Sequence, residues 1–407
     1  MNYKVSTVHI FFKETINITG SKSETNRLLL LQALFPAIQV ENISNSDDAV
    51  VMQKGLASDS SVVDIHHAGT AMRFLTAYFA GKEGSNVLLT GSARMKERPI
   101  KILVDALNSL GAEITYANTE GYPPLHIKGK KLTKSEVTLP ADISSQYISA
   151  LLLLAARLEN GLELTLIGKI TSIPYIEMTL ALLNEVGIKT KFEGNFIKVY
   201  PVKEEVEPTT LVVESDWSSA SYYYSIVALA EVGSQITLTS YKQNSLQGDS
   251  ALASFYKEMG VSTVFDANTL VLTKETDEVK NVAFDLTKTP DIAQTIAVTC
   301  FGLGIGCELS GLHTLKIKET DRLEALRVEL TKLGAIIKVT DKELFLQPST
   351  HFNENVAIDT YNDHRMAMAF APLTIKVPLI INDAMVVSKS YPDFWEDMKL
   401  LGVDVIV

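Results

Sequence analysis

The segment IKILVDALNSLGAEITY, residues 100–116, decides the fold of this 407-residue chain. Its first part places apolar residues three and four positions apart, as one buried helix face requires. A leucine and a glycine then end the helix, because glycine readily adopts the left-handed conformation that closes it. The β-branched residues that follow favour a short strand. The segment therefore predicts a helix, a tight turn and a strand.

The same pattern of helix, glycine and strand occurs six times. Its glycines lie roughly 55–75 residues apart, which suits a unit of several helices and strands better than a solenoid repeat. Six such units predict an α/β fold with internal symmetry. The other five are residues 47–65, where a longer link follows the glycine, 179–192, 252–265, 325–339 and 394–407.

Five further segments are almost entirely apolar, and each begins just after a polar cluster. Such helices are expected to be buried on all sides. Their N-termini offer unpaired backbone N–H groups and positive dipole ends, which suit anions. Neither GxGxxG nor GxxxxGK[ST] is present, so no common nucleotide-binding loop is predicted. The clusters are SKSETNR (21–27), HHAGTAM (66–72), DISSQY (142–147), SDWSSAS (215–221) and TPD (289–291).

The overall charge limits the possible ligands. The chain has 48 Asp and Glu against 37 Lys and Arg, a net charge of −11. Its global field repels nucleic acid and anionic membranes, so neither is an expected partner. The cations gather instead in short motifs at helix starts, where attraction is local. We therefore expect a small, multiply charged phosphate or carboxylate ligand.

Other features favour a cytoplasmic protein without a metal. Cys300 and Cys307 lie in an apolar run without a CxxC motif, and we interpret both as buried small hydrophobic residues. The histidines are not spaced as a metal-binding set. The N-terminus lacks the pattern of a signal peptide, and no apolar run reaches the roughly 18 residues of a membrane helix.

Taken one at a time, the polar motifs leave simpler explanations open. SKSETNR places Ser23 and Arg27 on one helix face, which fits an anion site or a capped, solvated helix end. In KIKETDR (316–322), helical spacing would place Lys318 and Arg322 on one helix face. This arrangement fits either an anion-binding site or a ladder of ion pairs on the surface. Asp291, like Asp216 and Asp363, fits a simple N-cap.

Together and in order, the motifs resemble the 5-enolpyruvylshikimate-3-phosphate synthase family, the enolpyruvyl transferases of aromatic amino-acid biosynthesis. The likeness spans essentially the whole chain. It implies two lobes, residues 1–20 with 215–407 and residues 21–214, each of three βαβαββ units around buried parallel helices, with the active site in the cleft between them. The motifs are GSKSETNR (20–27), AGTAMR (68–73), LTGSARMKERPI (89–100), SSQY (144–147), SDWSSASYY (215–223), PDIAQTIA (290–297), KETDRL (318–323), DHRMAMA (363–369) and SKSYPDFW (388–395).

This resemblance implies transfer of the enolpyruvyl group of phosphoenolpyruvate to the 5-hydroxyl of shikimate 3-phosphate, with release of phosphate and without a cofactor. Asp291 would be the base at the 5-hydroxyl and Glu319 the proton donor and acceptor at the methylene carbon, with Lys22 sharing in proton transfer. The implied ligands of shikimate 3-phosphate are Lys22, Ser23, Arg27, Ser144, Ser145, Gln146, Ser172, Asp291 and Lys318. Those of phosphoenolpyruvate are Lys22, Gly69, Arg94, Gln146, Arg322, Arg365 and Lys389.

Three alternatives remain at this stage. A UDP-N-acetylglucosamine enolpyruvyl transferase shares the fold and donor but usually carries a reactive cysteine, and the region TGSARMKERP (90–99) has none. An RNA 3′-terminal phosphate cyclase would need a basic surface, which the net charge disfavours. A small-anion-binding protein without catalysis is the third alternative. For the predicted synthase we expect a monomer.

Overall fold

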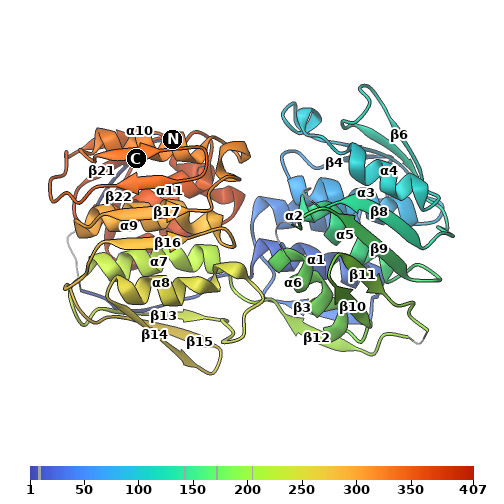
Figure 1. The fold of residues 1–407 in the computed structure, drawn as a ribbon, viewed down its shortest axis with the longest axis horizontal. Helices are drawn as coiled ribbons and strands as arrows, with labels where there is room; N and C mark the ends of the chain where they lie inside the picture. Colours follow the sequence, from blue (N-terminus) through green and yellow to red (C-terminus); the bar gives the residue numbers. More distant parts are fainter. Residues whose placement is uncertain (8–10, 142–143, 171–172, 204) are drawn as a thin grey trace. The chain divides into compact units, whose positions relative to one another are not determined.

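The computed structural model describes residues 1–7, 11–141, 144–170, 173–203 and 205–407. It divides into two compact units (Figure 1). Unit 1 comprises Met1–Thr19 and Glu214–Val407, and unit 2 comprises Gly20–Val213. In the part of the chain that is described, no helix has the length and apolar character needed to cross a membrane.

Unit 2 contains two four-stranded sheets and one pair of parallel strands. The first sheet has the order β4 (Val62–Asp64), β5 (Asn86–Thr90), β7 (Leu125–Lys128), β6 (Glu113–Tyr116), with helices α3 (Gly69–Gly81) and α4 (Lys101–Ser109). The second has the order β10 (Thr190–Glu193), β11 (Phe196–Val199), β9 (Leu162–Ile167), β8 (Glu136–Pro140), with α5 (Ser145–Ala155) and α6 (Ile173–Glu185). The pair is β12 (Thr209–Val212) and β3 (Ile38–Glu41), with α1 (Lys22–Leu34) and α2 (Asp47–Leu56).

Unit 1 contains three four-stranded sheets. The first is β14 (Val261–Asp266), β15 (Thr269–Lys274), β13 (Gln235–Thr239), β2 (Lys13–Ile16), with α7 (Trp217–Leu229) and α8 (Leu252–Glu258). The second is β16 (Val282–Asp285), β17 (Cys307–Ser310), β19 (Leu344–Leu346), β18 (Ile337–Val339), with α9 (Ala293–Leu303) and α10 (Arg322–Lys332). The third is β20 (Val356–Ile358), β21 (Leu379–Ile381), β1 (Tyr3–Thr7), β22 (Val403–Ile406), with α11 (His364–Phe370) and α12 (Phe394–Leu400).

Short 3₁₀ turns carry several polar residues discussed below. They are η1 (Met95–Glu97), η2 (Gly248–Ala251), η3 (Pro290–Ile292), η4 (Leu315–Ile317), η5 (Ala371–Ile375) and η6 (Ala384–Lys389).

The predicted α/β fold of repeated units is confirmed. In the sheet of β4 to β7 the chain runs β4, α3, β5, α4, β6, β7, and the first two strands are parallel while the rest are antiparallel. The sheets of β8 to β11 and β16 to β19 follow the same βαβαββ order. The parallel pair requires a crossover helix, which explains why an apolar helix separates its strands.

The first residues of the chain complete two sheets of unit 1. Strand β2 pairs in parallel with β13, although about two hundred residues separate them, and takes the position that β4 has in its own sheet. Strand β1 pairs antiparallel with both β21 and β22. All of unit 2 is thus inserted between a strand and the helix that follows it in the repeat, which makes unit 1 discontinuous in sequence.

The repeated glycines adopt the predicted conformation in five of six cases. Gly111, Gly187, Gly260, Gly334 and Gly402 all have positive φ. The exception, Gly55, lies inside α2, where a Cβ atom would be 2.4 Å from Leu75 Cδ1. The prediction of a terminating glycine is therefore wrong for residues 47–65, because α2 continues through Gly55, which packs against Leu75 of α3.

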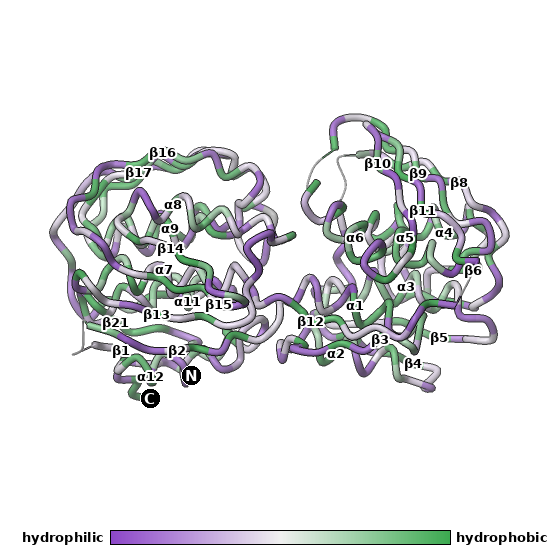
Figure 2. The backbone as a smooth tube through the Cα atoms, turned by 90° about the horizontal axis from the view of Figure 1, so that it is seen from below, coloured by the Kyte–Doolittle hydropathy of each residue, from purple (hydrophilic) through white to green (hydrophobic). Residues whose placement is uncertain are grey.

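The most apolar helices lie inside their units. All thirteen residues of α7 are buried, as are ten of α9. Figure 2 shows the strands of unit 1 at its periphery, with β16 and β17 on one side, β13 and β21 on another, and α7, α9 and α11 between them. A helix covered on all sides can be apolar on every face, which explains the lack of a polar stripe.

Buried hydroxyl groups fix α7 against α9. Ser221 Oγ lies 3.0 Å from Thr295 Oγ1, and one turn further Thr299 Oγ1 donates to Ser225 Oγ at 2.7 Å. Tyr256 on α8 joins the second pair at 2.8 Å. Hydrogen bonds between buried groups are directional, so these contacts set the register of the two helices. That register places the start of α9, with Asp291, beside the start of α7.

Candidate active site

In unit 1 the structure brings Asp291 together with three predicted cations. The Asp291 carboxylate lies 2.9 Å from Arg322 Nη1, 3.2 Å from Lys318 Nζ and 3.6 Å from Arg365 Nη2. Burial would raise the pKa of this carboxyl, but the charges of Lys318, Arg365 and Arg322 outweigh it and hold the pKa well below its usual value. Asp291 is therefore ionised at neutral pH in the substrate-free protein.

Arg322 joins Asp291 to two further carboxylates. It is 1% exposed, and its guanidinium contacts Asp363 Oδ2 at 2.7 Å through Nε and Glu319 Oε2 at 2.8 Å through Nη2. Burial would lower the pKa of Arg322, but the charges of Asp363, Glu319 and Asp291 raise it. The planar guanidinium of Arg322 thus fixes the separation between the two predicted proton-transfer groups, Asp291 and Glu319.

The predicted helical arrangement of KETDR is wrong. Helix α10 begins at Arg322, and Asp321 is its N-cap, accepting a hydrogen bond from the backbone N–H of Glu324 at 3.1 Å. Lys318 and Glu319 therefore lie in a bend before the helix and not on its face. They reach the same cluster because the capped bend turns the chain toward η3. The simple N-cap role considered for Asp291 is also wrong. The N-cap residues of η3 and α9 are Thr289 and Ile292, and the Asp291 carboxylate forms ion pairs instead.

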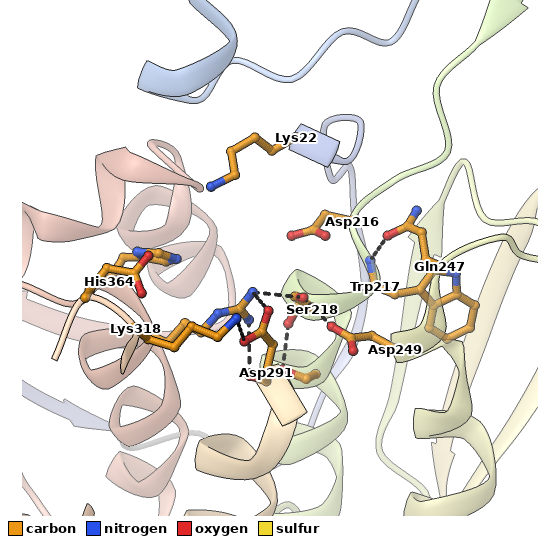
Figure 3. Close-up of polar contacts among 12 residues, drawn as sticks. Lys22, Asp216, Trp217, Ser218, Gln247, Asp249, Asp291, Lys318 and His364 are labelled. Atoms are coloured by element: carbon orange, nitrogen blue, oxygen red, sulfur yellow. Dashed lines mark hydrogen bonds and ion pairs between the residues drawn. The ribbon is translucent and has the colours of Figure 1, made fainter. Parts of the chain in front are cut away.

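Arg365 is held by a hydroxyl and a backbone carbonyl, and the hydroxyl in turn bonds a second carboxylate. Its Nη2 donates to Ser218 Oγ at 3.2 Å, its Nη1 donates to the backbone carbonyl of Asp291 at 3.3 Å, and the Ser218 hydroxyl donates to Asp249. Figure 3 shows these side chains pointing toward one another from η2, η3 and the start of α7. Burial, together with the charge of Asp291, raises the pKa of Asp249 to about 6.

Lys389 lies at the end of η6, and its Nζ donates to the backbone carbonyl and the side-chain oxygen of Asn362, both at 2.7 Å. The next residue, Asp363, binds Arg322. The structure thus places Lys389 against the loop that supports the cluster of Asp291, Lys318, Glu319, Arg322 and Arg365.

In unit 2, Arg27 is buried without a carboxylate partner among the described residues. Its guanidinium donates to Thr179 Oγ1 at 2.8 Å, Ser149 Oγ at 2.9 Å and the backbone carbonyl of Ser23 at 2.7 Å. The rings of Phe74 and Tyr175 lie 5.7 and 5.8 Å from it. Burial lowers the pKa of Arg27 to about 10. Arg27 therefore remains charged at neutral pH, and no ion pair within the described residues neutralises that charge.

The starts of α5 and α3 are joined by an amide. Ser144 is the N-cap of α5 and accepts from the Gln146 N–H at 3.4 Å, and Ser145 is the first residue of the helix. Gln146 Nε2 donates to Thr70 Oγ1 at 3.2 Å, next to Gly69 at the start of α3. Ser172, predicted to bind the same phosphate, lies outside the described residues.

Two other predicted cations of unit 2 have carboxylate partners. Lys22 Nζ lies 3.4 Å from Oδ1 of the buried Asp48 at the start of α2. Arg94 pairs with Glu97 at 2.8 Å, and both side chains are largely exposed, at 79% and 63%. An exposed ion pair such as Arg94–Glu97 is weak, so a bound anion could replace it.

Ser218 and Asp249 were missed as site residues. Ser218 lies in the SDWSSAS cluster but was not singled out there, and the signal for Asp249 was Gln247-Gly248-Asp249, a short polar run between a strand and a helix, which many loops share. Gln247 accepts from the Trp217 N–H at 3.0 Å and so ties this run to the start of α7. No group of three or more His, Cys, Asp or Glu side chains that could hold a metal ion occurs within the described ranges. Cys300 and Cys307 are buried and free, as predicted.

Comparison with solved structures defines the class of protein. An EPSP synthase from Acinetobacter baumannii superposes with a TM-score of 0.84 at 20% identity over 100% of both chains. The enolpyruvyl transferase NikO from Streptomyces tendae gives a TM-score of 0.73 at 15% identity, covering 100% of this chain and 98% of that chain. The fold is that of the two-domain enolpyruvyl transferases, which the charged clusters also suit.

Sequence comparison identifies the family. The model of the family EPSP synthase (3-phosphoshikimate 1-carboxyvinyltransferase) matches residues 34–398. A 3-phosphoshikimate 1-carboxyvinyltransferase from Bacteroides fragilis is 45% identical over 400 residues, covering 97% of each chain. One from Haemophilus influenzae is 35% identical over 419 residues, covering 95% of each. The chain therefore belongs to the EPSP synthase family and is an enzyme of the transferase class.

Proposed function

We propose that this enzyme transfers the enolpyruvyl group of phosphoenolpyruvate to the 5-hydroxyl of shikimate 3-phosphate and releases phosphate, as a step of aromatic amino-acid biosynthesis. The observation that carries the proposal is the pair of carboxylates, Asp291 and Glu319, held on one guanidinium in a chain 45% identical to a protein of this name. Such a pair suits a reaction in which one carbon gains a proton while an oxygen loses one.

The reaction has two stages. The 5-hydroxyl oxygen bonds to C2 of phosphoenolpyruvate and loses its proton to Asp291, while Glu319 delivers a proton to the methylene carbon. The resulting adduct carries the shikimate oxygen and the phosphate on the same carbon. Glu319 then removes a proton from the new methyl group as the C–O bond to phosphate breaks. The double bond is thereby restored, and the proton taken up by Asp291 passes to the departing phosphate, so that Asp291 is again ionised and Glu319 again protonated for the next cycle.

Substrate binding would tune Asp291 for this role. In the substrate-free protein three cations hold its pKa well below the usual value, which makes it a weak base. Substrate anions that bind Lys318 and Arg365 would offset part of this positive charge. The pKa of Asp291 would then rise toward neutrality, because nearby negative charge disfavours the ionised carboxylate.

The cations of unit 2 would bind the two substrates. We assign Lys22, Ser23, Arg27, Ser144, Ser145 and Gln146 to shikimate 3-phosphate, and Gly69, Arg94 and Gln146 to phosphoenolpyruvate, together with Arg322, Arg365 and Lys389 of unit 1. Supporting this, the helix starts of α3 and α5 are joined by Gln146, so a single amide can contact both ligands. We further infer a cytoplasmic monomer, consistent with the two free cysteines.

Phosphate release tests the function. The purified enzyme is given phosphoenolpyruvate with shikimate 3-phosphate and, separately, with UDP-N-acetylglucosamine. Turnover with the first acceptor alone supports the proposal. Turnover with the second acceptor alone would show that the protein is a UDP-N-acetylglucosamine enolpyruvyl transferase. Binding without turnover would show that it is a small-anion-binding protein without catalysis.

A further inference from the structure

We infer that Arg98 is a further ligand of phosphoenolpyruvate, binding its anionic group at the start of α3 together with Gly69. This inference rests on the proposed function. It adds Arg98, which the family resemblance did not imply, to the proposed ligands of phosphoenolpyruvate. It is drawn from the surroundings of the first turn of α3, which carries positive charge from two arginines.

The first observation is the position of the Arg98 guanidinium. A Cβ atom placed on Gly69 would lie 2.5 Å from Arg98 Nη1 and 3.1 Å from Arg98 Cζ. The guanidinium therefore rests against the backbone of the first residue of α3. This helix has thirteen residues, and its N-cap residue, Ala68, makes no side-chain capping bond. Backbone N–H groups at such a helix start attract anions.

The second observation is the arginine one turn further along the same helix. Arg73 is 4% exposed, and its Nη1 donates to the Gly69 carbonyl at 3.1 Å, so its guanidinium faces the first turn of α3. Its Nε is buried and has no hydrogen-bond partner. Burial, and next the charge of Arg98, lower the pKa of Arg73. The protein thus places two like charges near each other.

The third observation is that neither arginine is directly paired with a carboxylate among the described residues. Within the described residues, neither Arg73 nor Arg98 has a carboxylate within 4.0 Å, whereas Arg94 on the same loop pairs with Glu97. A like-charge pair beside a positive helix end is unfavourable until an anion arrives. Arg98 is exposed, so it can move onto a ligand without breaking an ion pair. Its planar fork suits either carboxylate or phosphate.

The test compares Arg98→Ala, Arg98→Lys and the control Lys96→Ala in steady-state kinetics. Lys96 is an exposed cation of the same loop, so its removal changes the net charge equally. We expect Arg98→Ala to raise the KM for phosphoenolpyruvate about tenfold and Arg98→Lys about threefold, with the KM for shikimate 3-phosphate within about twofold. Lys96→Ala should stay within about twofold of the wild type for both substrates.

Two kinetic results would overturn the inference. One is a KM for phosphoenolpyruvate that changes equally in Arg98→Ala and Lys96→Ala. The other is an equal rise in the KM for both substrates in Arg98→Ala. Loss of fold is checked by the unliganded melting temperature, and Arg98→Lys supplies a variant that keeps the charge and nearly the volume.

A binding measurement separates this inference from the proposed function. If the wild type does not release phosphate, the proposed function fails, and the shift in melting temperature caused by phosphoenolpyruvate alone decides the role of Arg98. A shift that is present in the wild type and lost in Arg98→Ala supports the inference. An absent shift, or one unchanged in Arg98→Ala, overturns it.

Discussion

Arg322 of unit 1 and Arg27 of unit 2 are both buried, at 1% and 3% exposure, but they are stabilised in opposite ways. Arg322 contacts three carboxylates, and their charge raises its pKa. Arg27 contacts only hydroxyls, carbonyls and aromatic rings among the described residues, and burial lowers its pKa to about 10. Unit 1 therefore neutralises its cation internally, whereas unit 2 keeps positive charge that an anionic substrate can neutralise.

This difference suggests a division of labour. Carboxylates held by cations keep a fixed orientation, as proton transfer requires. Buried cations without counter-charges bind anions strongly, because no ion pair has to be broken first. Unit 1 would supply the proton-transfer groups and unit 2 much of the substrate affinity. The predictions below test this division.

The largest effect is expected for the carboxylates of unit 1. Asp291→Asn and Glu319→Gln should each lower turnover about a hundredfold or more, because each removes a proton-transfer group while keeping the side-chain shape. The KM for each substrate should change by no more than about threefold. Steady-state phosphate release measures both quantities. Near-normal turnover in both variants would show that unit 1 does not supply the proton-transfer groups.

The next effect compares the two buried arginines directly. Arg322→Met should destabilise unit 1 by about 3–5 kcal/mol, because Asp363, with 0% exposure, loses its charged partner. Arg27→Met should destabilise unit 2 by only about 1–3 kcal/mol, since only neutral partners lose hydrogen bonds. A larger cost for Arg27→Met than for Arg322→Met would break the comparison.

The chain allows the two units to be followed separately in urea. Both tryptophans, Trp217 and Trp395, belong to unit 1, so tryptophan fluorescence reports its unfolding alone. Hydrogen exchange in α1, α5 and α6 reports unit 2. Each variant also serves as the control for the other, because neither change should alter the unit that it does not belong to.

A smaller effect concerns Asp249, a carboxylate of unit 1 whose pKa lies above its usual value. An acid with a raised pKa in the folded state binds its proton more tightly there than in the unfolded chain. Its ionisation therefore costs stability as pH rises from about 4 to about 6, and the cost is constant above that range. Asp249→Asn should remove this cost and stabilise unit 1 by about 1–2 kcal/mol at pH 7.

Urea unfolding followed by tryptophan fluorescence at pH 4, 5, 6 and 7 measures this dependence. The difference between Asp249→Asn and the wild type should be near zero at pH 4 and grow up to about pH 6. Asp285, an exposed carboxylate whose hydrogen bond to Thr287 lowers its pKa, gives a control. Asp285→Asn should not stabilise the protein at pH 7, and a stabilisation equal to that of Asp249→Asn would contradict the assignment.

Much of the fold could be predicted because its signals are local. The apolar spacing of residues 100–116 and the left-handed Gly111 both depend on a few neighbouring residues. The pairing of β2 with β13 could not be predicted, because no local pattern specifies a partner some two hundred residues away. The same limit explains Gly55, whose role depends on Leu75 in another helix.

The charged residues of the unit 1 cluster could be named from the sequence, but their geometry could not. The order of the motifs indicated Asp291 and Arg322, yet their bond depends on the bend before α10, which the helical interpretation of KETDR missed. The neutral partners of Arg27 come from two other helices, and hydroxyls in apolar helices give no signal of their own. Asp249 lacked any cation nearby in sequence, so only the tertiary fold shows its contact with Ser218.

The smallest effect concerns Arg94, a predicted cation of unit 2 that, like Lys22, has a carboxylate partner. Its pair with Glu97 is exposed and spans three residues, so Glu97→Gln should change stability by no more than about 0.5 kcal/mol. The KM for phosphoenolpyruvate should nevertheless fall about twofold at low salt, because Arg94 no longer has to leave an ion pair to bind the substrate. The gain should disappear at high salt, where exposed pairs are screened. Glu193→Gln, which breaks an exposed pair with Lys191 in the same unit, controls for net charge and should leave this KM unchanged. An equal fall in both variants would mean that the overall charge of the enzyme, and not the release of Arg94, sets the affinity.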